Sequence, residues 1–291
     1  MSRLGVLGWP VAHSRSPAMH NAALRALGLD GWSYQRLPVP PELFEGTVRA
    51  LGAAGFVGAN VTIPHKRAAL VLADSASAAA REIGAANTLS FTADGIAAEN
   101  TDAPGLLAAI ERAPDGPGSL AGTSALVLGA GGSARAAVWA LRQAGARDVA
   151  IWNRTAARAA VLADELGARA VPRPQAADII VNCTSVGLDG AAAAGGNAQP
   201  GSGESATDGQ RVGEALNQLG LTLDLVGGYS YVVDLVYSDG LTPLLLAARE
   251  RGVPALDGLE ILVAQGALSF ELWTGRRAPL DVMRRAARET P

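Results

Sequence analysis

The chain has 291 residues, a length that one hydrophobic core seldom organises, so we expect two domains. Hydrophobic residues make up 49% of it and the net charge is −3, which excludes wholesale disorder and makes nucleic acid or an anionic membrane a poor partner. No apolar stretch reaches the roughly 18 residues that span a bilayer. The first residues show no signal-peptide pattern, so we expect a cytoplasmic protein.

Short strands and helices alternate through the first half of the chain. A strand is expected over residues 4–7, and a helix over 17–27 with Ser16 as its N-cap and a proline after it. Further along, the pattern predicts a helix over 41–51, a strand over 59–63, a helix after Pro64 and another that opens at 101–104. This alternation predicts βα units and a mostly parallel sheet.

The second half reads as a Rossmann-type domain. A continuous apolar run over 125–128 predicts a strand that is covered on both faces. A glycine-rich turn and a helix through Leu141 follow, and further strands are expected over 148–152, 179–182 and 231–235. Residues 188–222 are rich in small and polar residues, which predicts a flexible insertion with a short helix near 212–219.

The turn after the first of these strands has the sequence of a dinucleotide-binding loop. Gly129-x-Gly131-x-x-Ala134 lies between a strand and a helix, the context that makes the pattern informative. The glycines permit a tight turn and close approach of a pyrophosphate, which would meet the free N–H groups of the helix. The predicted cofactor-binding residues of this turn are Gly129, Ala130, Gly131, Gly132, Ser133 and Ala134. The alternative is a glycine-rich turn that binds nothing.

The end of the next strand indicates which dinucleotide is bound. An NAD site usually has a carboxylate there to bind the ribose 2′-hydroxyl. Here the strand is followed by Asn153, Arg154 and Thr155, with Arg158 one turn later. Two guanidinium groups and a hydroxyl suit a 2′-phosphate, so these four residues predict NADP rather than NAD.

The basic residues point to a proton-transfer group. Of the 24 basic residues only Lys66 is a lysine. Arginine cannot release a proton near neutral pH, whereas lysine can, so Lys66 is a candidate acid–base residue. It could otherwise be an ordinary surface lysine. A carbonyl reduced by hydride needs a proton donor, and Asp102, at a predicted helix start, is the carboxylate that we expect beside Lys66.

Other polar residues stand at strand and helix ends of the first half. Ser14 and Ser16 lie at a helix N-terminus that would favour an anion, although Ser16 could be a plain cap and Asp102 likewise. The histidines have no metal-ligand spacing and Cys183 is the only cysteine, so no metal site is predicted.

These motifs together resemble the shikimate dehydrogenase family over nearly the whole chain. The resemblance rests on Ser14–Pro17, Asn60–Lys66, Asn87–Thr88, Asn100–Asp102, Gly129–Arg135, Asn153–Thr155, Asp234–Tyr237, Thr242–Leu244 and Gly258–Gln265. It implies an α/β fold of two domains with a cleft between them: a substrate-binding domain of 1–102 and 258–291, and a Rossmann-type NADP-binding domain of 103–257.

The resemblance also implies an activity and residue roles. The activity is the NADP-dependent reversible reduction of 3-dehydroshikimate to shikimate, in chorismate and aromatic amino acid biosynthesis, by a monomer or homodimer. Lys66 and Asp102 would be catalytic, and Ser14 and Ser16 would bind the substrate carboxylate. The ring hydroxyls and pocket would involve Asn60, Thr62, Asn87, Gln265 and, near the carboxylate, Tyr237. Quinate or aminoshikimate as the substrate, or a non-catalytic NADP-binding sensor, are the alternatives.

Overall fold

A computed structural model describes residues 2–188 and 208–289 of the chain. Two compact units are present. One comprises Met1–Gly105 and Leu262–Pro291, and the other comprises Leu106–Ile261. The boundaries fall inside helix α5 (Asp102–Arg112) and helix α12 (Gly258–Thr274). Among the described residues, no helix is long and apolar enough to cross a membrane.

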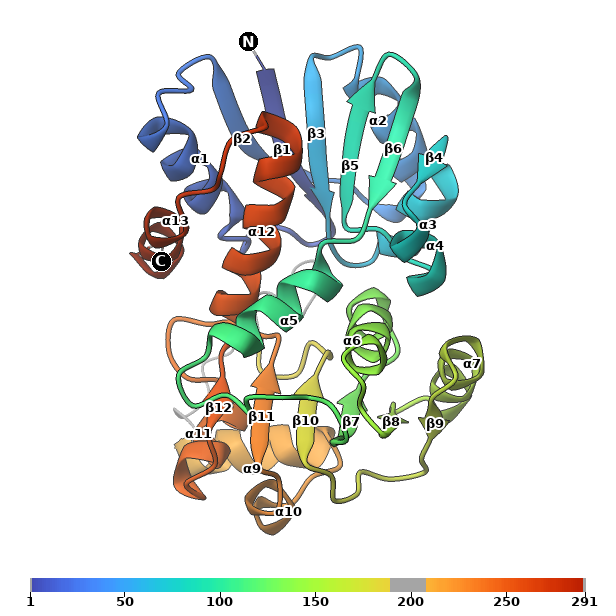
Figure 1. The fold of residues 1–291 in the computed structure, drawn as a ribbon, viewed down its shortest axis with the longest axis vertical. Helices are drawn as coiled ribbons and strands as arrows, with labels where there is room; N and C mark the ends of the chain where they lie inside the picture. Colours follow the sequence, from blue (N-terminus) through green and yellow to red (C-terminus); the bar gives the residue numbers. More distant parts are fainter. Residues whose placement is uncertain (1, 189–207, 290–291) are drawn as a thin grey trace, which may run out of the picture. The chain divides into compact units, whose positions relative to one another are not determined.

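The first unit contains a mixed six-stranded sheet, with the strand order β2-β1-β3-β5-β6-β4 (Figure 1). Its strands are β1 (Ser2–Gly8), β2 (Trp32–Pro38), β3 (Phe56–Val61), β4 (Ser75–Ala76), β5 (Thr88–Thr92) and β6 (Gly95–Glu99). Strand β1 is parallel to β2 and β3, whereas β5 is antiparallel to both of its neighbours. The βα pattern of the sequence does not predict the β5–β6 hairpin, whose turn has Gly95 at φ 113°.

The two faces of this sheet are covered by different helices. The helices are α1 (Ser16–Ala26), α2 (Phe44–Leu51) after the 3-10 turn η1 (Pro41–Leu43), α3 (Lys66–Leu72), α4 (Ala78–Ile83), α12 and α13 (Leu280–Glu289). On β3, Ala59 and Val61 join the core cluster that includes α2 and α3. Gly58 points the other way, because a Cβ there would lie 2.1 Å from the Trp273 indole of α12. Strand alternation therefore turns Asn60 toward α12.

The start of α1 differs from the sequence prediction. Ser16 is the first helical residue rather than the N-cap, and Arg15 occupies the cap position without a side-chain cap bond. The backbone of Arg15 already has φ −87° and ψ −3°, so the chain turns into the helix one residue earlier than the Ser-Pro pattern suggests. The prediction of Ser16 as a plain cap is therefore wrong.

The second unit has the Rossmann strand order. Its strands are β7 (Ser124–Leu128), β8 (Asp148–Trp152), β9 (Arg169–Ala170), β10 (Ile179–Asn182), β11 (Tyr231–Asp234) and β12 (Ala255–Leu256). They lie in the order β12-β11-β10-β7-β8-β9 and every pair is parallel. Strand order reverses between β7 and β10, and a ligand of such a sheet binds at the carboxyl ends of the strands at that point. The predicted Rossmann-type domain is confirmed.

Helices cover both faces of the second sheet. They are α6 (Gly132–Gln143), α7 (Ala156–Leu166), α9 (Asp208–Gln218), α10 (Leu223–Gly227) and α11 (Pro243–Glu250). Leu126, Ile180 and Val232 point toward α9, α10 and α11 and form one core cluster with them. Helix α6 instead contacts β7, β8 and α7.

The predicted flexible insertion is only partly described, and the described part is ordered core. Residues 189–207 lie outside the described residues. Helix α9 covers the short helix expected near 212–219, but Leu216, Leu219 and Leu221 are buried in the core cluster of the second unit. The prediction of a flexible insertion is wrong for residues 208–222, because polar composition hid an apolar stripe at helical spacing.

Candidate active site

Lys66 and Asp102 form an ion pair in the first unit. Lys66 is the first residue of α3 and Asp102 the first of α5, and Lys66 Nζ lies 2.6 Å from Asp102 Oδ2. Their side chains are 11% and 14% exposed, so the pair is largely withdrawn from water and still reachable. A small molecule beside it would meet both an ammonium donor and a carboxylate acceptor.

Asn87 holds the Asp102 carboxylate from the other side. The backbone N–H of Thr101 donates to Asn87 Oδ1 at 2.7 Å, which fixes the orientation of the amide. Asn87 Nδ2 therefore faces Asp102 Oδ1 at 2.8 Å and Gln265 Oε1 at 3.1 Å. Gly105 makes this arrangement possible, because a Cβ there would lie 2.7 Å from Gln265 Cβ and push α5 away from α12.

Behind this amide lies a buried polar cluster, which we define as Asn60, Asn87, Thr88, Thr101, Gln265 and Ser269. The Ser269 hydroxyl is at its centre, 2.9 Å from Asn60 Nδ2, 2.9 Å from Thr88 Oγ1 and 3.1 Å from Thr101 Oγ1. It also donates to the Gln265 carbonyl at 3.1 Å. Sequence reasoning missed Ser269, although its position one helical turn after Gln265 is a signal that could have found it.

Asn60 connects strand β3 to the polar cluster. Its Oδ1 accepts the Tyr34 hydroxyl at 2.8 Å, and its Nδ2 donates within the polar cluster. Both polar atoms are therefore bonded inside the protein, and the residue is only 5% exposed. The polar atoms of Asn87 and Gln265 likewise have partners inside the protein, so hydrogen bonding does not separate Asn60 from these other two predicted residues. Thr62, just after β3, is half-buried, and its backbone N–H donates to the Leu7 carbonyl.

Ser14 and Ser16 lie together at the start of α1. Ser16 N–H donates to Ser14 Oγ at 3.3 Å, and both residues are buried. The Arg36 guanidinium donates to the Ser14 carbonyl twice, at 3.0 and 2.7 Å, and so holds this turn from strand β2. Burial lowers the pKa of His13, and the positive charge of Arg36 lowers it further. Sequence reasoning missed Arg36, because nothing in the spacing of β2 relates it to Ser14.

His65, next to Lys66 in the sequence, points away from the ion pair. Its Nε2 lies 2.7 Å from the Val39 carbonyl, and its ring stacks on Phe44 with centroids 4.3 Å apart. Burial lowers the pKa of His65, opposed by the Val39 hydrogen bond. His65 is therefore a packed core residue in this structure.

In the second unit, the glycine-rich turn has the geometry of a phosphate cradle. Gly129 has φ 108°, and a Cβ on it would lie 3.2 Å from the Cys183 backbone. Gly131 is the N-cap of α6 with no side-chain cap bond, and a Cβ there would meet nothing within 4 Å. Ala134 is fully buried, so α6 packs closely on the sheet. Ala130, Gly132 and Ser133 complete the turn, which opens at the strand-order reversal. The glycines of this turn and the open space at Gly131 fit a pyrophosphate at the N-terminus of α6.

The loop after β8 carries the residues predicted to select the dinucleotide. Asn153 Nδ2 donates to the Thr155 carbonyl at 2.9 Å and shapes the loop. Arg154, Thr155 and Arg158 are exposed, and Arg158 lies in the first turn of α7. An anion at this loop would meet two guanidinium groups and a hydroxyl.

Comparison with known proteins identifies the family. Family models match residues 6–89 (shikimate dehydrogenase substrate binding domain), 111–186 (shikimate / quinate 5-dehydrogenase) and 258–288 (shikimate 5'-dehydrogenase C-terminal domain). A shikimate dehydrogenase (NADP(+)) of Paracoccus denitrificans (strain Pd 1222) is 42% identical over 95% of this chain and 92% of its own length. The chain belongs to the shikimate dehydrogenase family.

Other members of the shikimate dehydrogenase family agree over the full length. A shikimate dehydrogenase (NADP(+)) of Thermus thermophilus is 43% identical and covers 99% of this chain and 98% of its own. A crystal structure of shikimate 5-dehydrogenase from another strain of Thermus thermophilus, in complex with NADP(H) and shikimate, has a TM-score of 0.80, 41% identity and 99% coverage of both chains. The resemblance drawn from the sequence motifs is confirmed.

Tyr237 belongs to the second unit, three residues beyond β11. Within the described ranges, no group of three or more His, Cys, Asp or Glu side chains could hold a metal ion.

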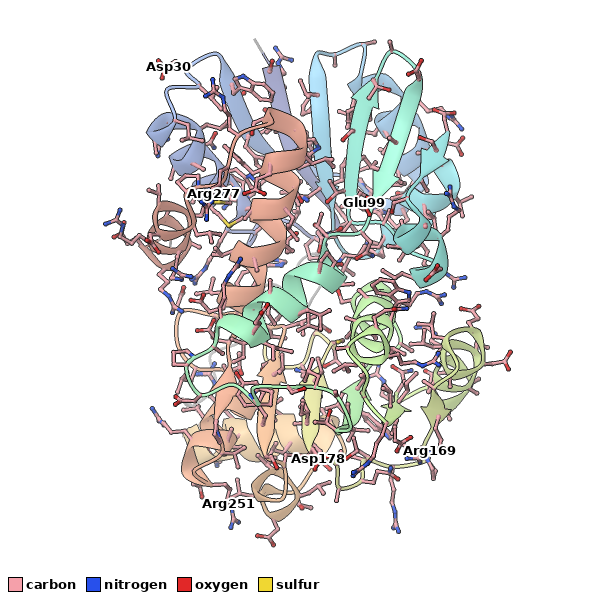
Figure 2. All side chains as sticks on the ribbon, in the orientation of Figure 1. Asp30, Glu99, Arg169, Asp178, Arg251 and Arg277 are labelled. Carbon is pink, nitrogen blue, oxygen red and sulfur yellow. The ribbon has the colours of Figure 1, made fainter. Side chains whose placement is uncertain are left out.

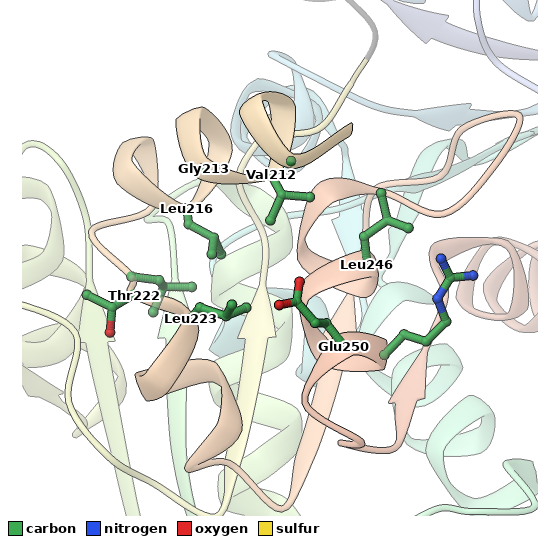
Figure 3. A pocket seen from close by; sticks show the side chains of 10 residues that line it. Val212, Gly213, Leu216, Thr222, Leu223, Leu246 and Glu250 are labelled. Carbon is green, nitrogen blue, oxygen red and sulfur yellow. The ribbon is translucent and has the colours of Figure 1, made fainter. Parts of the chain in front are cut away.

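A hollow of about 740 Å³ lies elsewhere in the second unit, between α9, α10 and α11 (Figure 3). Leu216, Leu223 and Leu246 line it, and the Glu250 carboxylate points into it. It contains neither the glycine-rich turn nor the loop after β8, so we do not assign it to dinucleotide binding.

Proposed function

We propose that this chain catalyses the NADP-dependent reversible reduction of 3-dehydroshikimate to shikimate, a step of chorismate and aromatic amino acid biosynthesis. The observation that carries the proposal is the 2.6 Å contact between Lys66, the chain's only lysine, and Asp102. The names of the full-length relatives, shikimate dehydrogenase (NADP(+)), support the substrate and the cofactor.

The ion pair supplies the proton side of the reaction. Bound NADPH supplies a hydride to the carbonyl carbon, and the carbonyl oxygen then needs a proton. The Lys66 ammonium donates that proton, and in the reverse direction the neutral amine removes one from the hydroxyl. Asp102 keeps the ammonium oriented and accepts a hydrogen bond from the neighbouring substrate hydroxyl. Asn87 holds the carboxylate in place for both tasks.

The remaining polar residues of the first unit orient the substrate. Ser14 and Ser16 bind its carboxylate at the N-terminus of α1, where the helix dipole favours an anion. Asn60, Thr62, Asn87 and Gln265 bind ring hydroxyls. Hydrogen bonds within the polar cluster hold Asn60, Asn87 and Gln265 in place. Tyr237 lines the pocket near the carboxylate.

The second unit binds the dinucleotide. The turn from Gly129 to Ala134 holds the pyrophosphate at the N-terminus of α6, where N–H groups and the helix dipole favour an anion. Asn153, Arg154, Thr155 and Arg158 form the 2′-phosphate site. We further propose that the protein works in the cytoplasm as a monomer or homodimer.

The test follows NADPH absorbance with purified protein and 3-dehydroshikimate. Wild type should oxidise NADPH and use NADH poorly, and Lys66→Ala should lose about 10²–10⁴-fold in kcat while still binding shikimate. Arg67→Ala, which removes the exposed neighbouring cation, is the matched control and should stay near wild type. Oxidation of quinate or an aminoshikimate by NADP+, with no reduction of 3-dehydroshikimate by NADPH, would change the substrate assignment. NADPH binding without any turnover would favour a sensor.

A further inference from the structure

A buried carboxylate connects two loops at the carboxyl edge of the second sheet. Asp234, the last residue of β11, has no exposed surface. Its Oδ1 accepts Asn182 Nδ2 at 2.9 Å and the Val236 backbone N–H at 3.1 Å, and its Oδ2 accepts the Thr242 hydroxyl at 2.6 Å. Three hydrogen-bond donors, one from the end of β10 and two from the segment 235–242, therefore meet one carboxylate.

The first partner extends this connection toward the glycine-rich turn. Because a carboxylate can only accept, Asp234 makes Asn182 present Nδ2 to it. Asn182 Oδ1 is then turned to the backbone N–H and hydroxyl of Thr184, at 3.0 and 2.8 Å. The segment 183–187 held in this way begins against Gly129, where a Cβ would lie 3.2 Å from Cys183.

The second partner fixes the segment that carries Tyr237. The Thr242 side chain bonds Asp234 and also caps α11 by accepting the Leu245 N–H. Residues 235–242 are thus held at both ends by Asp234. Gly187 lies against this segment, since a Cβ there would be 3.5 Å from Pro243 Cδ and 3.6 Å from Thr242 Cβ. The two loops pack on each other next to the strand-order reversal.

We propose that Asp234 is a positioning residue for NADP(H), which fixes segments 183–187 and 235–242 in the form that accepts the dinucleotide. The inference rests on the proposed function, because it takes the glycine-rich turn as the dinucleotide site. Burial raises the pKa of Asp234 to about 6, while its three hydrogen bonds favour the charged form. At pH 7.5 the group is therefore the ionised acceptor that its three donors require.

The decisive experiment compares two carboxylates of the same sheet. Asp234→Asn replaces one acceptor by a donor, so one of the three donors loses its partner. Asp178→Asn is the matched control: Asp178 accepts the Ser124 backbone N–H at 2.7 Å and its hydroxyl at 2.8 Å, but at the amino ends of β7 and β10, as Figure 2 shows. The dissociation constant of NADPH is measured by fluorescence at pH 7.5, with the melting temperature of each variant.

Asp234→Asn should weaken NADPH binding about fivefold or more, with KM for NADPH rising in step. The kcat should stay within about twofold, because Lys66 and Asp102 are unchanged. KM for 3-dehydroshikimate rises as well if Tyr237, which segment 235–242 carries, loses its place, so the dissociation constant of NADPH, measured without substrate, is the deciding number. Asp178→Asn should lower the melting temperature without moving the NADPH constant. An unchanged NADPH constant in folded Asp234→Asn, or an equal loss in Asp178→Asn, overturns the inference.

A second pair of variants decides the matter should Asp234→Asn not fold. Thr242→Ser keeps the hydroxyl and should bind NADPH like wild type. Thr242→Val lacks the hydroxyl and should bind NADPH more weakly. Equal NADPH affinity of the two variants overturns the inference. Wild type that binds NADPH but leaves 3-dehydroshikimate unreduced overturns only the proposed substrate, since the NADPH constants still test Asp234. Wild type that binds no NADPH overturns both.

Discussion

Lys66 and Asp102 are 36 residues apart in sequence, and their charged atoms lie 2.6 Å apart. Each begins a helix, α3 for Lys66 and α5 for Asp102, so the pair depends on two chain turns being placed together. Asn87 holds the other carboxylate oxygen at 2.8 Å. The carboxylate thus has an assigned partner on each oxygen, and its removal should affect the ammonium as well.

Asp102→Asn should lower kcat by about 10²–10⁴-fold, because the ammonium loses the group that orients it. Lys66→Met should do the same, and the double variant should be little worse than either single one, since the two residues act as a unit. Steady-state kinetics on all three variants measure this, with Asp94→Asn, at an exposed position, as the control. Losses that multiply in the double variant would show that the two residues act independently.

Arg154→Gln combined with Arg158→Gln should raise KM for NADPH at least about tenfold and leave KM for NADH within about twofold, because only NADPH carries the 2′-phosphate. The measurement is initial rate against each dinucleotide. Arg173→Gln combined with Arg276→Gln removes two exposed arginines outside the loop and controls for net charge. An equal rise in KM for NADPH and for NADH would show that the two arginines do not bind the 2′-phosphate.

Ser269→Ala should destabilise the protein by about 1–3 kcal/mol, because Asn60, Thr88 and Thr101 lose a buried partner. It should also raise KM for 3-dehydroshikimate, since Asn87 and Gln265 belong to the same cluster. Urea unfolding and kinetics give both numbers. Thr274→Ala is the control, since it loses one bond to the Phe270 carbonyl on the same helix and one from the Arg276 N–H, both outside the polar cluster. A KM as low as that of the control would limit Ser269 to a structural role.

His20 should make the protein sensitive to acid. It is fully buried and stacked on Tyr34, and neither ring nitrogen has a hydrogen-bond partner among the residues that the structure describes. Burial lowers the pKa of His20 from 6.5 to about 3. Between these two pKa values the unfolded chain binds a proton at His20 and the folded chain does not. The stability that depends on neutral His20 is therefore fully present above pH 6.5 and is lost as the pH falls toward 3.

When the pH falls from 7 to 4.5, the buried His20 should lower the free energy of unfolding by about 2.5 kcal/mol. His20→Phe, which keeps an aromatic ring on Tyr34, should flatten the pH dependence by that amount. Urea unfolding of both proteins at several pH values measures the difference. Parallel curves for wild type and variant would show that His20 titrates normally.

Leu216→Ala should destabilise the protein by about 2–5 kcal/mol, the range for truncating a buried leucine. Leu216 is 4% exposed and packs in the core of the second unit. Urea unfolding measures the loss. Gln218→Ala changes an exposed residue of the same helix and should stay within about 0.5 kcal/mol of wild type. A loss as small as that of the control would show that Leu216 of α9 does not contribute to the core.

The local sequence pattern was sufficient to predict the strands of the second unit and its dinucleotide-binding loop. The strands at 125–128, 148–152 and 179–182 and the glycine-rich turn between β7 and α6 are determined by neighbours within about ten residues. For the same reason the solitary lysine and the ordered motifs of the family could be recognised from the sequence. Backbone hydrogen bonds within a helix, and side-chain alternation along a strand, are local effects that a short window contains.

Tertiary structure alone decided which polar side chains share a contact. Ser14 and Arg36, or Asn60 and Ser269, meet only because separate strands and helices place them together. The sequence shows Asn60 only as a polar residue near a strand end, and the fold alone brings Tyr34, Thr88 and Ser269 to its two polar atoms. The same holds for residues 208–222, whose polar composition hides leucines that a distant sheet buries. Hydrogen bonding and burial depend on neighbours in space, which a local stretch of sequence does not specify.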